Sequence, residues 1–484
     1  MKQKDFLFNV ILLIFLNLLI KPFWILGIDV GVQNSVGAEN YGLYFAVFNF
    51  TFLFNMLLDM GISNFNNRNI ARHSHLLEKH LSGIITLKIL LGILYMLVIF
   101  MVALIIGYRD FQLKLLFWMG VNQFLNTFIL YLRSNISALL MFKTDSFLSI
   151  LDRLLMIIFC GVLLWGNMTN EPFRIEWFVY CQTLAYSISA FIALMIVIKK
   201  AHVQKLSWNL SFFRMILKKS LPFAILYLLM SFYNRIDSVM IERLLPDDIA
   251  AFEVGIYASA FRLLDALVMI AYLFSVILLP LFSKMLKDKE NLNPIIKTSF
   301  SLLYFFAITA VVLLEYYRYP ILELLYHNHI TESAEVFKIL IPCIIPISFT
   351  YIFGTLLTAN GNMRLLNITA IAGIVVNVLV NLFLIPRLYA KGAAIASLST
   401  QSVVSFLQIV IVFKQLKVSF HQIPYLSCIL FTVIIIPSVY LFTKFFSGNV
   451  LFSLFIATVF AILLGLTTRL ISLGIIKELK IKRK

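Results

Sequence analysis

The sequence predicts an all-α, polytopic membrane protein with about fourteen transmembrane helices. Of its 484 residues, 61% are hydrophobic and only 13% are charged, and apolar stretches long enough to cross a bilayer recur along the whole chain. A soluble domain carries about 25% charged residues, so this chain lacks the polar side chains needed to cover a core of its size. We therefore expect most of its apolar side chains to face lipid.

Each predicted span is an apolar stretch of about 20 residues, the length that crosses about 30 Å of hydrocarbon. Polar residues, Gly or Pro mark the breaks between spans, as at 37–40, 246–248 and 360–362. The N-terminal stretch resembles a signal sequence, but no small-residue cleavage site follows it, so we interpret it as an uncleaved first span. The predicted spans are 6–27, 41–60, 82–107, 114–140, 146–166, 175–198, 217–242, 254–280, 296–317, 335–359, 365–386, 391–413, 425–445 and 450–473.

The charges in the loops predict that both termini lie in the cytoplasm. With the N-terminus inside, most Lys and Arg residues fall on inside loops, as the positive-inside rule requires. The asymmetry recurs along the chain, which favours an even number of spans. The net charge of +17 then reflects orientation and contact with anionic lipid heads rather than nucleic acid. The basic residues of the outside loops are Arg109, Arg174, Arg243, Arg318, Arg387 and Lys444.

A short repeat predicts two related halves. The second span opens with 39–44 (ENYGLY) and the eighth opens with 253–257 (EVGIY), an offset of six spans. Internal repeats are common in transporters, which place the binding site between the repeats. We therefore expect an N-terminal six-helix lobe at 1–200, a C-terminal six-helix lobe at 201–415, and two additional helices with a basic cytoplasmic tail at 416–484.

Charged residues inside the predicted spans are the candidate functional residues. A charged side chain at mid-membrane costs about 2.5–3.5 kcal/mol on insertion scales, so it requires a partner or a hydrated cavity. Charged groups near span ends can instead extend to the interface. Polar side chains at helical spacing form stripes on spans four, seven, eleven and twelve. The charged residues are Lys21, Lys88, Arg133, Asp152, Arg153, Arg235, Asp237, Glu242, Arg262 and Asp265.

We interpret these stripes as the lining of a hydrated central cavity. Arg235, Arg262 and Arg133 would bind an anion, because a guanidinium donates two parallel hydrogen bonds to a phosphate. Asp237 and Asp265 would bind a coupling proton or sodium ion. The amide side chains that would bind the hydroxyls of a sugar are Asn122, Asn126, Asn377 and Asn381.

An alternative interpretation is that the same groups only hold helices together. Arg262 and Asp265 are three residues apart and therefore adjacent on a helix. Arg235 could pair with Glu242 or Asp237 in the same span. Buried Asn and Ser side chains also join transmembrane helices by hydrogen bonds, so the sequence leaves both interpretations open.

Motifs for catalysis and cofactor binding are absent from the sequence. It contains no nucleotide-binding loop, zinc motif or serine-nucleophile motif. The four Cys residues lie inside predicted spans without the spacing of a metal or redox site, and the outside loops leave no room for a catalytic domain. We expect no enzymatic activity, no metal and no cofactor, with a proton or sodium gradient as the candidate energy source.

Motifs along nearly the whole chain resemble those of one transporter family. They are 37–42 (GAENYG), 57–62 (LLDMGI), 66–71 (NNRNIA), 235–237 (RID), 257–262 (YASAFR), 278–283 (LLPLFS), 359–362 (ANGN), 381–386 (NLFLIP) and 391–396 (KGAAIA). Their order and spacing resemble the polysaccharide biosynthesis transporters, the O-antigen and capsule repeat-unit flippases. These belong to the multidrug/oligosaccharidyl-lipid/polysaccharide exporter superfamily.

This resemblance implies two six-helix lobes that alternate between inward-open and outward-open forms. The implied substrate is an undecaprenyl-diphosphate-linked oligosaccharide, moved from the cytoplasmic to the outer leaflet of a bacterial inner (plasma) membrane. The implied partners are this substrate and membrane lipids, with a polysaccharide polymerase and a chain-length regulator as further candidates, and no nucleic acid. Fourteen spans resemble the lipid II flippase branch, whereas many O-antigen flippases have twelve.

Two rival functions remain open. An ion-coupled multidrug antiporter of the same superfamily would favour an acidic or aromatic cavity for cations, and the intramembrane arginines argue against it. A membrane glycosyltransferase or polysaccharide polymerase would need a sizeable outside loop carrying catalytic Asp or Arg residues. The short outside loops argue against this second rival.

Overall fold

The described part of the chain is helical and contains no strand, so the all-α class is confirmed. Eleven of its helices are long and apolar enough to cross a membrane, which confirms a multi-pass protein, and the total of fourteen stays a prediction. The start of the first span (6–16) and the basic tail (477–484) lie outside the described residues. The computed structural model describes residues 17, 19–20, 22–63, 66–67, 70, 75–139, 141–166, 171–201, 208–416, 423–446 and 448–471.

The first two spans are interrupted helices. The π-helix η1 (Trp24–Asp29) continues directly into α2 (Val30–Leu53). Within α2 the backbone breaks at Gly37, whose φ of 81° and ψ of 165° are open to glycine because it has no Cβ atom. The first helix thus extends to residue 36 rather than ending at the predicted residue 27, because the apolar side chains beyond residue 27 are buried. A second break separates α2 from the short helix α3 (Met56–Asp59).

The later helices coincide with the predicted spans, and α13, η2 and α14 together form the tenth. Helix α9 is absent from the eleven strongly apolar helices, because its last ten residues carry four charged side chains. The bounds are α5 (Leu76–Ile105), α6 (Asp110–Ala138), α7 (Phe142–Trp165), α8 (Ile175–Ala201), α9 (Leu210–Leu244), α10 (Asp247–Lys287), α11 (Asn293–Tyr316), α12 (Arg318–Leu325), α13 (Ile330–Leu340), η2 (Ile341–Cys343), α14 (Ile344–Ala359), α15 (Met363–Leu388), α16 (Ala390–Gln415), α17 (Tyr425–Phe445) and α18 (Val450–Thr467).

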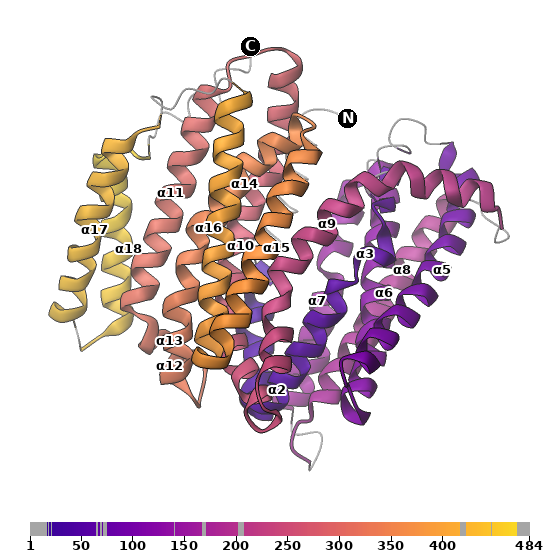
Figure 1. Cartoon of the computed structure of the whole chain (residues 1–484), viewed down its shortest axis with the longest axis horizontal. Coiled ribbons are helices and arrows are strands. Elements are labelled where there is room, and N and C mark those ends of the chain that lie inside the picture. Colours follow the sequence, from indigo (N-terminus) through magenta and orange to yellow (C-terminus); the bar gives the residue numbers. More distant parts are fainter. Residues whose placement is uncertain are drawn as a thin grey trace. The chain divides into compact units, whose positions relative to one another are not determined.

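The helices form two compact units, residues 1–258 and 259–484. In the first unit α6 packs against α8 and α2, and α9 packs along α2. In the second unit α16 packs against α15 and α14, while α17 and α18 lie side by side against α11 (Figure 1). The lobes at 1–200 and 201–415 and the addition at 416–484 stay a prediction about which parts move in transport.

An apolar core joins α3, α5, α6, α7, α8 and α9 in the first unit. Leu81, Tyr131 and Ile216 are among its fully buried members. The opposite face of α5 exposes large apolar side chains such as Leu97 and Ile105. Exposed apolar side chains on a helix of this length are expected where the helix faces lipid, so α5 lies between the core and the membrane.

The repeated sequence motif marks the point where α2 and α10 cross. A Cβ atom added at Gly42 would overlap the carbonyl oxygen of Ala251, and one added at Gly255 would overlap that of Ala38. Each overlapped residue lies four positions before the other glycine, so the two motif copies meet in a local twofold arrangement. The repeat is therefore explained by a reciprocal backbone contact that requires glycine on both helices.

Candidate functional site

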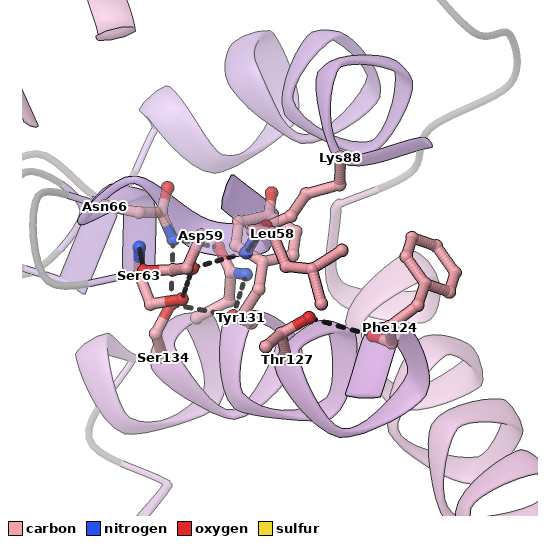
Figure 2. Close-up of polar contacts among 10 residues, drawn as sticks. Leu58, Asp59, Ser63, Asn66, Lys88, Phe124, Thr127, Tyr131 and Ser134 are labelled. Atoms are coloured by element: carbon pink, nitrogen blue, oxygen red, sulfur yellow. Dashed lines mark hydrogen bonds and ion pairs between the residues drawn. The ribbon is translucent and has the colours of Figure 1, made fainter. Parts of the chain in front are cut away.

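An ion pair between Asp59 of α3 and Lys88 of α5 lies inside the first unit (Figure 2). The Lys88 ammonium donates hydrogen bonds to the Asp59 carboxylate and to the Leu58 carbonyl, the latter at 3.0 Å. It also lies 5.8 Å from the centroid of the Tyr131 ring. The Lys88 side chain is 1% exposed, whereas that of Asp59 is 26% exposed and accepts hydrogen bonds from Ser63. The cation is therefore sealed inside the helices, and the carboxylate lies nearer the opening.

A break in the second span forms this pair. Helix α3 ends at Asp59, and the next two residues, Met60 and Gly61, both have left-handed φ angles, 44° and 77°. This conformation is unfavourable for a residue with a side chain such as Met60, and such strain is concentrated at functional sites. The turn directs the Leu58 carbonyl and the Asp59 carboxylate to one ammonium. Discontinuous transmembrane helices commonly form the sites of transporters.

A polar network joins the segment after α3 to α6 (Figure 2). The Asn66 side chain donates hydrogen bonds to the Ser134 hydroxyl at 3.1 Å and to the Asn135 carbonyl oxygen at 2.9 Å. Ser134 and Asn135 in turn donate to the backbone carbonyl of Tyr131 at 2.7 and 2.9 Å. The network holds α6 beside the ion pair, with the ring of Tyr131 under the ammonium.

The predicted polar stripe on α9 faces α2. The half-buried Arg235 donates from Nη1 to Oδ1 of Asn49 at 3.4 Å, and its guanidinium lies 5.4 Å from the centroid of the Phe52 ring. Asn49 donates from Nδ2 to the Ser238 hydroxyl at 2.9 Å. The pairing of Arg235 with Glu242 that the sequence left open is not formed, because Glu242 has a different basic partner, described below.

The two predicted coupling-ion carboxylates lie in different units. Asp237 is 1% exposed and accepts a hydrogen bond at 3.0 Å from the hydroxyl of Tyr257, the tyrosine of the second motif copy. Asp265 lies 4.0 Å from Nη1 of Arg262, measured from its Oδ2 atom, and is one-quarter exposed. The pairing of Arg262 with Asp265 that the sequence left open is therefore formed at the outer limit of an ion pair.

The predicted residues on α6 contact neighbouring helices. Arg133 forms an ion pair with Asp145 of α7, with 2.8 Å between Nε and Oδ1. An anionic ligand at Arg133 would have to compete with this carboxylate. Asn122 is buried and donates to the backbone carbonyl of Val179 in α8 at 3.3 Å, and Asn126 is half-buried one turn farther along. These contacts are compatible with helix packing and leave the predicted ligand role a prediction.

The predicted amides of α15 lie together in the second unit. Asn381 donates from Nδ2 to Oδ1 of Asn377 at 3.0 Å, and both side chains are fully buried. Helix α15 packs here against α16 and α14. The spacing of four residues correctly predicted that the two amides share one face.

A second buried cation, Arg153 of α7, lies outside the predicted site. It donates from Nη1 to the Tyr186 hydroxyl at 3.1 Å, and its guanidinium lies 5.6 Å from the centroid of the Trp24 ring. Its Nε atom is 3.7 Å from the Asp152 carboxylate. Aromatic faces stabilise a guanidinium, but these rings come from η1 and α8, so the sequence around Arg153 does not reveal them.

A polar cavity of about 260 Å³ lies at the helix ends that the loop charges predict to be outer. It is formed by the turn between α5 and α6, the end of α9 and the start of α10. Its lining combines two arginines with two carboxylates, so the cavity is polar without a strong excess of either charge. Its lining residues are Leu43, Gly107, Arg109, Gln112, Glu242, Arg243, Asp247, Ala250 and Ala251.

Glu242 is the buried centre of this region, with 4% of its surface exposed. Its carboxylate accepts hydrogen bonds from the Tyr108 hydroxyl at 2.9 Å, from the Gln112 amide, and from Nη2 of Arg243 at 2.8 Å. Burial and the adjacent carboxylate raise the pKa of Tyr108 well above its ordinary value, so its hydroxyl stays a donor. Arg243 also donates to the Ile106 carbonyl at 3.0 Å. These bonds fasten the end of α9 to the turn between α5 and α6.

No metal-binding cluster is present among the residues that the structure describes. In that part of the chain, no three His, Cys, Asp or Glu side chains are placed to hold a metal ion. The four cysteines are buried thiols. The groups available to a ligand are therefore the arginines, amides and carboxylates described above.

Comparisons with known proteins cover most of the chain. The profile of a family described as "Polysaccharide biosynthesis protein" matches residues 6–286, and the profile MatE matches residues 222–383. No curated protein sequence matches the chain.

Solved structures share the fold. The structure titled lipid II flippase MurJ, inward closed conformation, has a TM-score of 0.70 and 16% identity, covering 98% of each chain. A MOP superfamily transporter from Pyrococcus furiosus Vc1 (DSM3638) has a TM-score of 0.60 and 12% identity, covering 84% of this chain and 95% of its own. An inward-facing multidrug resistance MATE family transporter has a TM-score of 0.59 and 14% identity, covering 81% of this chain and 94% of its own.

Proposed function

The chain belongs to the polysaccharide biosynthesis protein family, whose profile matches more than half of it, and on this premise we propose that it is a flippase for lipid-linked oligosaccharides. Its fold is that of MOP superfamily transporters, as the sequence motifs predicted. The proposed substrate is an undecaprenyl-diphosphate-linked oligosaccharide, moved from the cytoplasmic to the outer leaflet of a bacterial inner membrane. No covalent bond changes in this movement, so we propose a transporter and not an enzyme.

Arg235 is the observation that carries this proposal. Its guanidinium lies half-buried on a membrane helix, between the Asn49 amide and the face of the Phe52 ring. Maintaining a charge there costs about 2.5–3.5 kcal/mol on insertion scales, which is expected where the charge serves a ligand. A diphosphate suits this group because a guanidinium binds phosphate oxygens with two parallel hydrogen bonds.

In the proposed cycle, the sugar of the lipid enters the inward-open form while the polyprenyl tail stays in the bilayer. Arg235 and Arg262 bind the diphosphate, and alternating access then brings the sugar to the outer side. Asp237 and Asp265 are the proposed sites of a coupling proton or sodium ion. Amides replace water around the sugar hydroxyls, which lowers the cost of burying them. These amides are Asn122, Asn126, Asn377 and Asn381.

Transbilayer movement of a lipid-linked oligosaccharide in liposomes containing the purified protein tests this function. We expect movement above that of empty liposomes, and loss of it in the double variant Arg235→Ala with Arg262→Ala. The matched control is Arg174→Ala, because Arg174 is 57% exposed and pairs with Glu171 at the surface. Full activity in the double variant would refute the anion-binding role of the two arginines.

The MatE match over residues 222–383 favours one alternative, an ion-coupled multidrug antiporter. The same liposomes distinguish it when they are loaded with a fluorescent drug cation and given a proton or sodium gradient. Gradient-driven cation efflux without movement of the lipid-linked sugar would establish the antiporter. Sugar-lipid movement that depends on the gradient would establish a coupled flippase.

A further inference from the structure

We propose that Glu242 is a proton-binding site at the outer helix ends, and that its protonation releases α9 from the turn between α5 and α6. The sequence placed Glu242 near a span end, where a charged group can extend to the interface. Its carboxylate is instead buried and joins two parts of the chain. The inference rests on the proposed function only in that opening of the outer ends is a step of alternating access.

The geometry makes Glu242 the ionisable member of a seam between α9–α10 and the helices before them. Two other contacts across this seam join neutral groups. They are the hydrogen bonds from the Gln33 amide to the Gly255 carbonyl at 3.0 Å and from the Asn49 amide to the Ser238 hydroxyl at 2.9 Å. A proton does not alter these bonds, whereas it removes the charge of Glu242.

Water and protons can reach Glu242 through the cavity that it lines. A cavity needs about 10–15 Å³ to hold one water molecule, and this one measures about 260 Å³. Arg109 and Asp247 line the same cavity and are exposed. The Glu242 carboxylate is thus buried against protein on one side and borders a polar, hydrated space on the other.

Protonation would weaken several contacts at once. Three donors converge on the carboxylate, namely the Tyr108 hydroxyl, the Gln112 amide and the Arg243 guanidinium. Hydrogen bonds to an ionised acceptor are about twice as strong as those between neutral groups. A neutral Glu242 would leave Arg243 with the Ile106 carbonyl and with the face of the Tyr108 ring, whose centroid lies 4.8 Å away.

The charged groups around Glu242 determine the direction of the response. Arg243 on α9 and Arg109 at the start of α6 favour the carboxylate, and Asp247 at the start of α10 favours the protonated acid. As the pH on the outer side falls, Glu242 takes up a proton, its charge-assisted bonds are lost, and the seam opens. The ligand of this site is therefore a proton supplied from the outer side.

Distance measurements between spin labels test the proposal in the full chain without any lipid-linked sugar. Labels at Asp110→Cys and Asp248→Cys occupy exposed positions at the starts of α6 and α10. In lipid nanodiscs we expect the fraction of long distances to rise as the pH falls from about 8 to about 5, a range in which buried carboxyl groups titrate. Unchanged distances over this range would overturn the proposal.

Three variants identify Glu242 as the responsible group. Glu242→Gln should show, at about pH 8, the long-distance fraction that the unsubstituted chain reaches only at about pH 5. Asp247→Asn, the matched control in the same cavity, should keep the pH response. Tyr108→Phe removes one donor to the carboxylate without changing charge, so it should move the midpoint to higher pH.

The outcomes separate this proposal from the proposed function. A Glu242→Gln variant that stays closed at the higher pH, or a Tyr108→Phe variant with an unmoved midpoint, would overturn the proton site. Helix content and elution volume show whether each variant folds, and Tyr108→Phe carries the test if Glu242→Gln does not fold. Because the labels report opening without substrate, a negative flipping assay would refute the flippase and leave the proton site standing.

Discussion

Removing the carboxylate of Asp59 should destabilise the protein more than removing the ammonium of Lys88. Breaking a buried ion pair by deleting one partner costs about 3–5 kcal/mol. Asp59→Asn leaves an ammonium that is 1% exposed without its counter-charge, so we expect a loss within that range. Lys88→Met leaves a carboxylate that is 26% exposed and retains its hydrogen bonds from Ser63, so we expect a loss below about 3 kcal/mol.

The double variant separates charge from packing. Asp59→Asn with Lys88→Met removes both charges, and replacing a buried ion pair by uncharged groups is often close to neutral. We therefore expect the double variant to be more stable than Asp59→Asn alone. The assay is denaturant unfolding of the purified protein in detergent, followed by helix content for all four members of the cycle. Equal losses in the two single variants, or fully additive losses in the double variant, would refute this explanation.

Other contacts give three further predictions. Gly42→Ala should abolish transport, because its Cβ atom would overlap the Ala251 carbonyl, whereas Gly448→Ala, where no atom lies within 4 Å, should leave transport unchanged; comparable flipping rates in the two variants would contradict this. Asn209→Ala removes the side chain that caps the first turn of α9 and should lower the free energy of unfolding by about 1 kcal/mol, as measured by denaturant unfolding. Arg153→Lys retains the charge but loses the planar contacts with two aromatic rings, so the melting temperature should fall, and an unchanged value would contradict the stacking role.

Apolar length and turn residues predicted the helices well. The bounds predicted for the thirteenth span, 425–445, coincide with α17, and the breaks expected at 246–248 and 360–362 separate helices as predicted. The first span was different, because its helix continues beyond residue 27 to the break at Gly37. The continuing side chains are apolar and buried, and hydropathy alone cannot say where such a helix leaves the membrane.

Candidate site residues were easier to identify than their partners. Charge inside an apolar span is visible in the sequence, so Lys88 and Arg153 were found as intramembrane cations. Their partners come from other helices, since Asp59 lies 29 positions before Lys88 and the Tyr186 hydroxyl lies 33 positions after Arg153. Spacing along one helix defines a face but does not identify what packs against it. For the same reason the partner of Arg133 on α7 was not predicted.

The turn after Asp59 has a consequence for protein engineering. Lys88 is satisfied by two oxygens that the broken end of α3 directs to it, so the interrupted helix and the lysine depend on each other. A chimera with another member of the family would keep both if residues 56–88 were exchanged as one block. A junction placed between α3 and α5 would combine a buried lysine with a helix end that was never shaped to receive it.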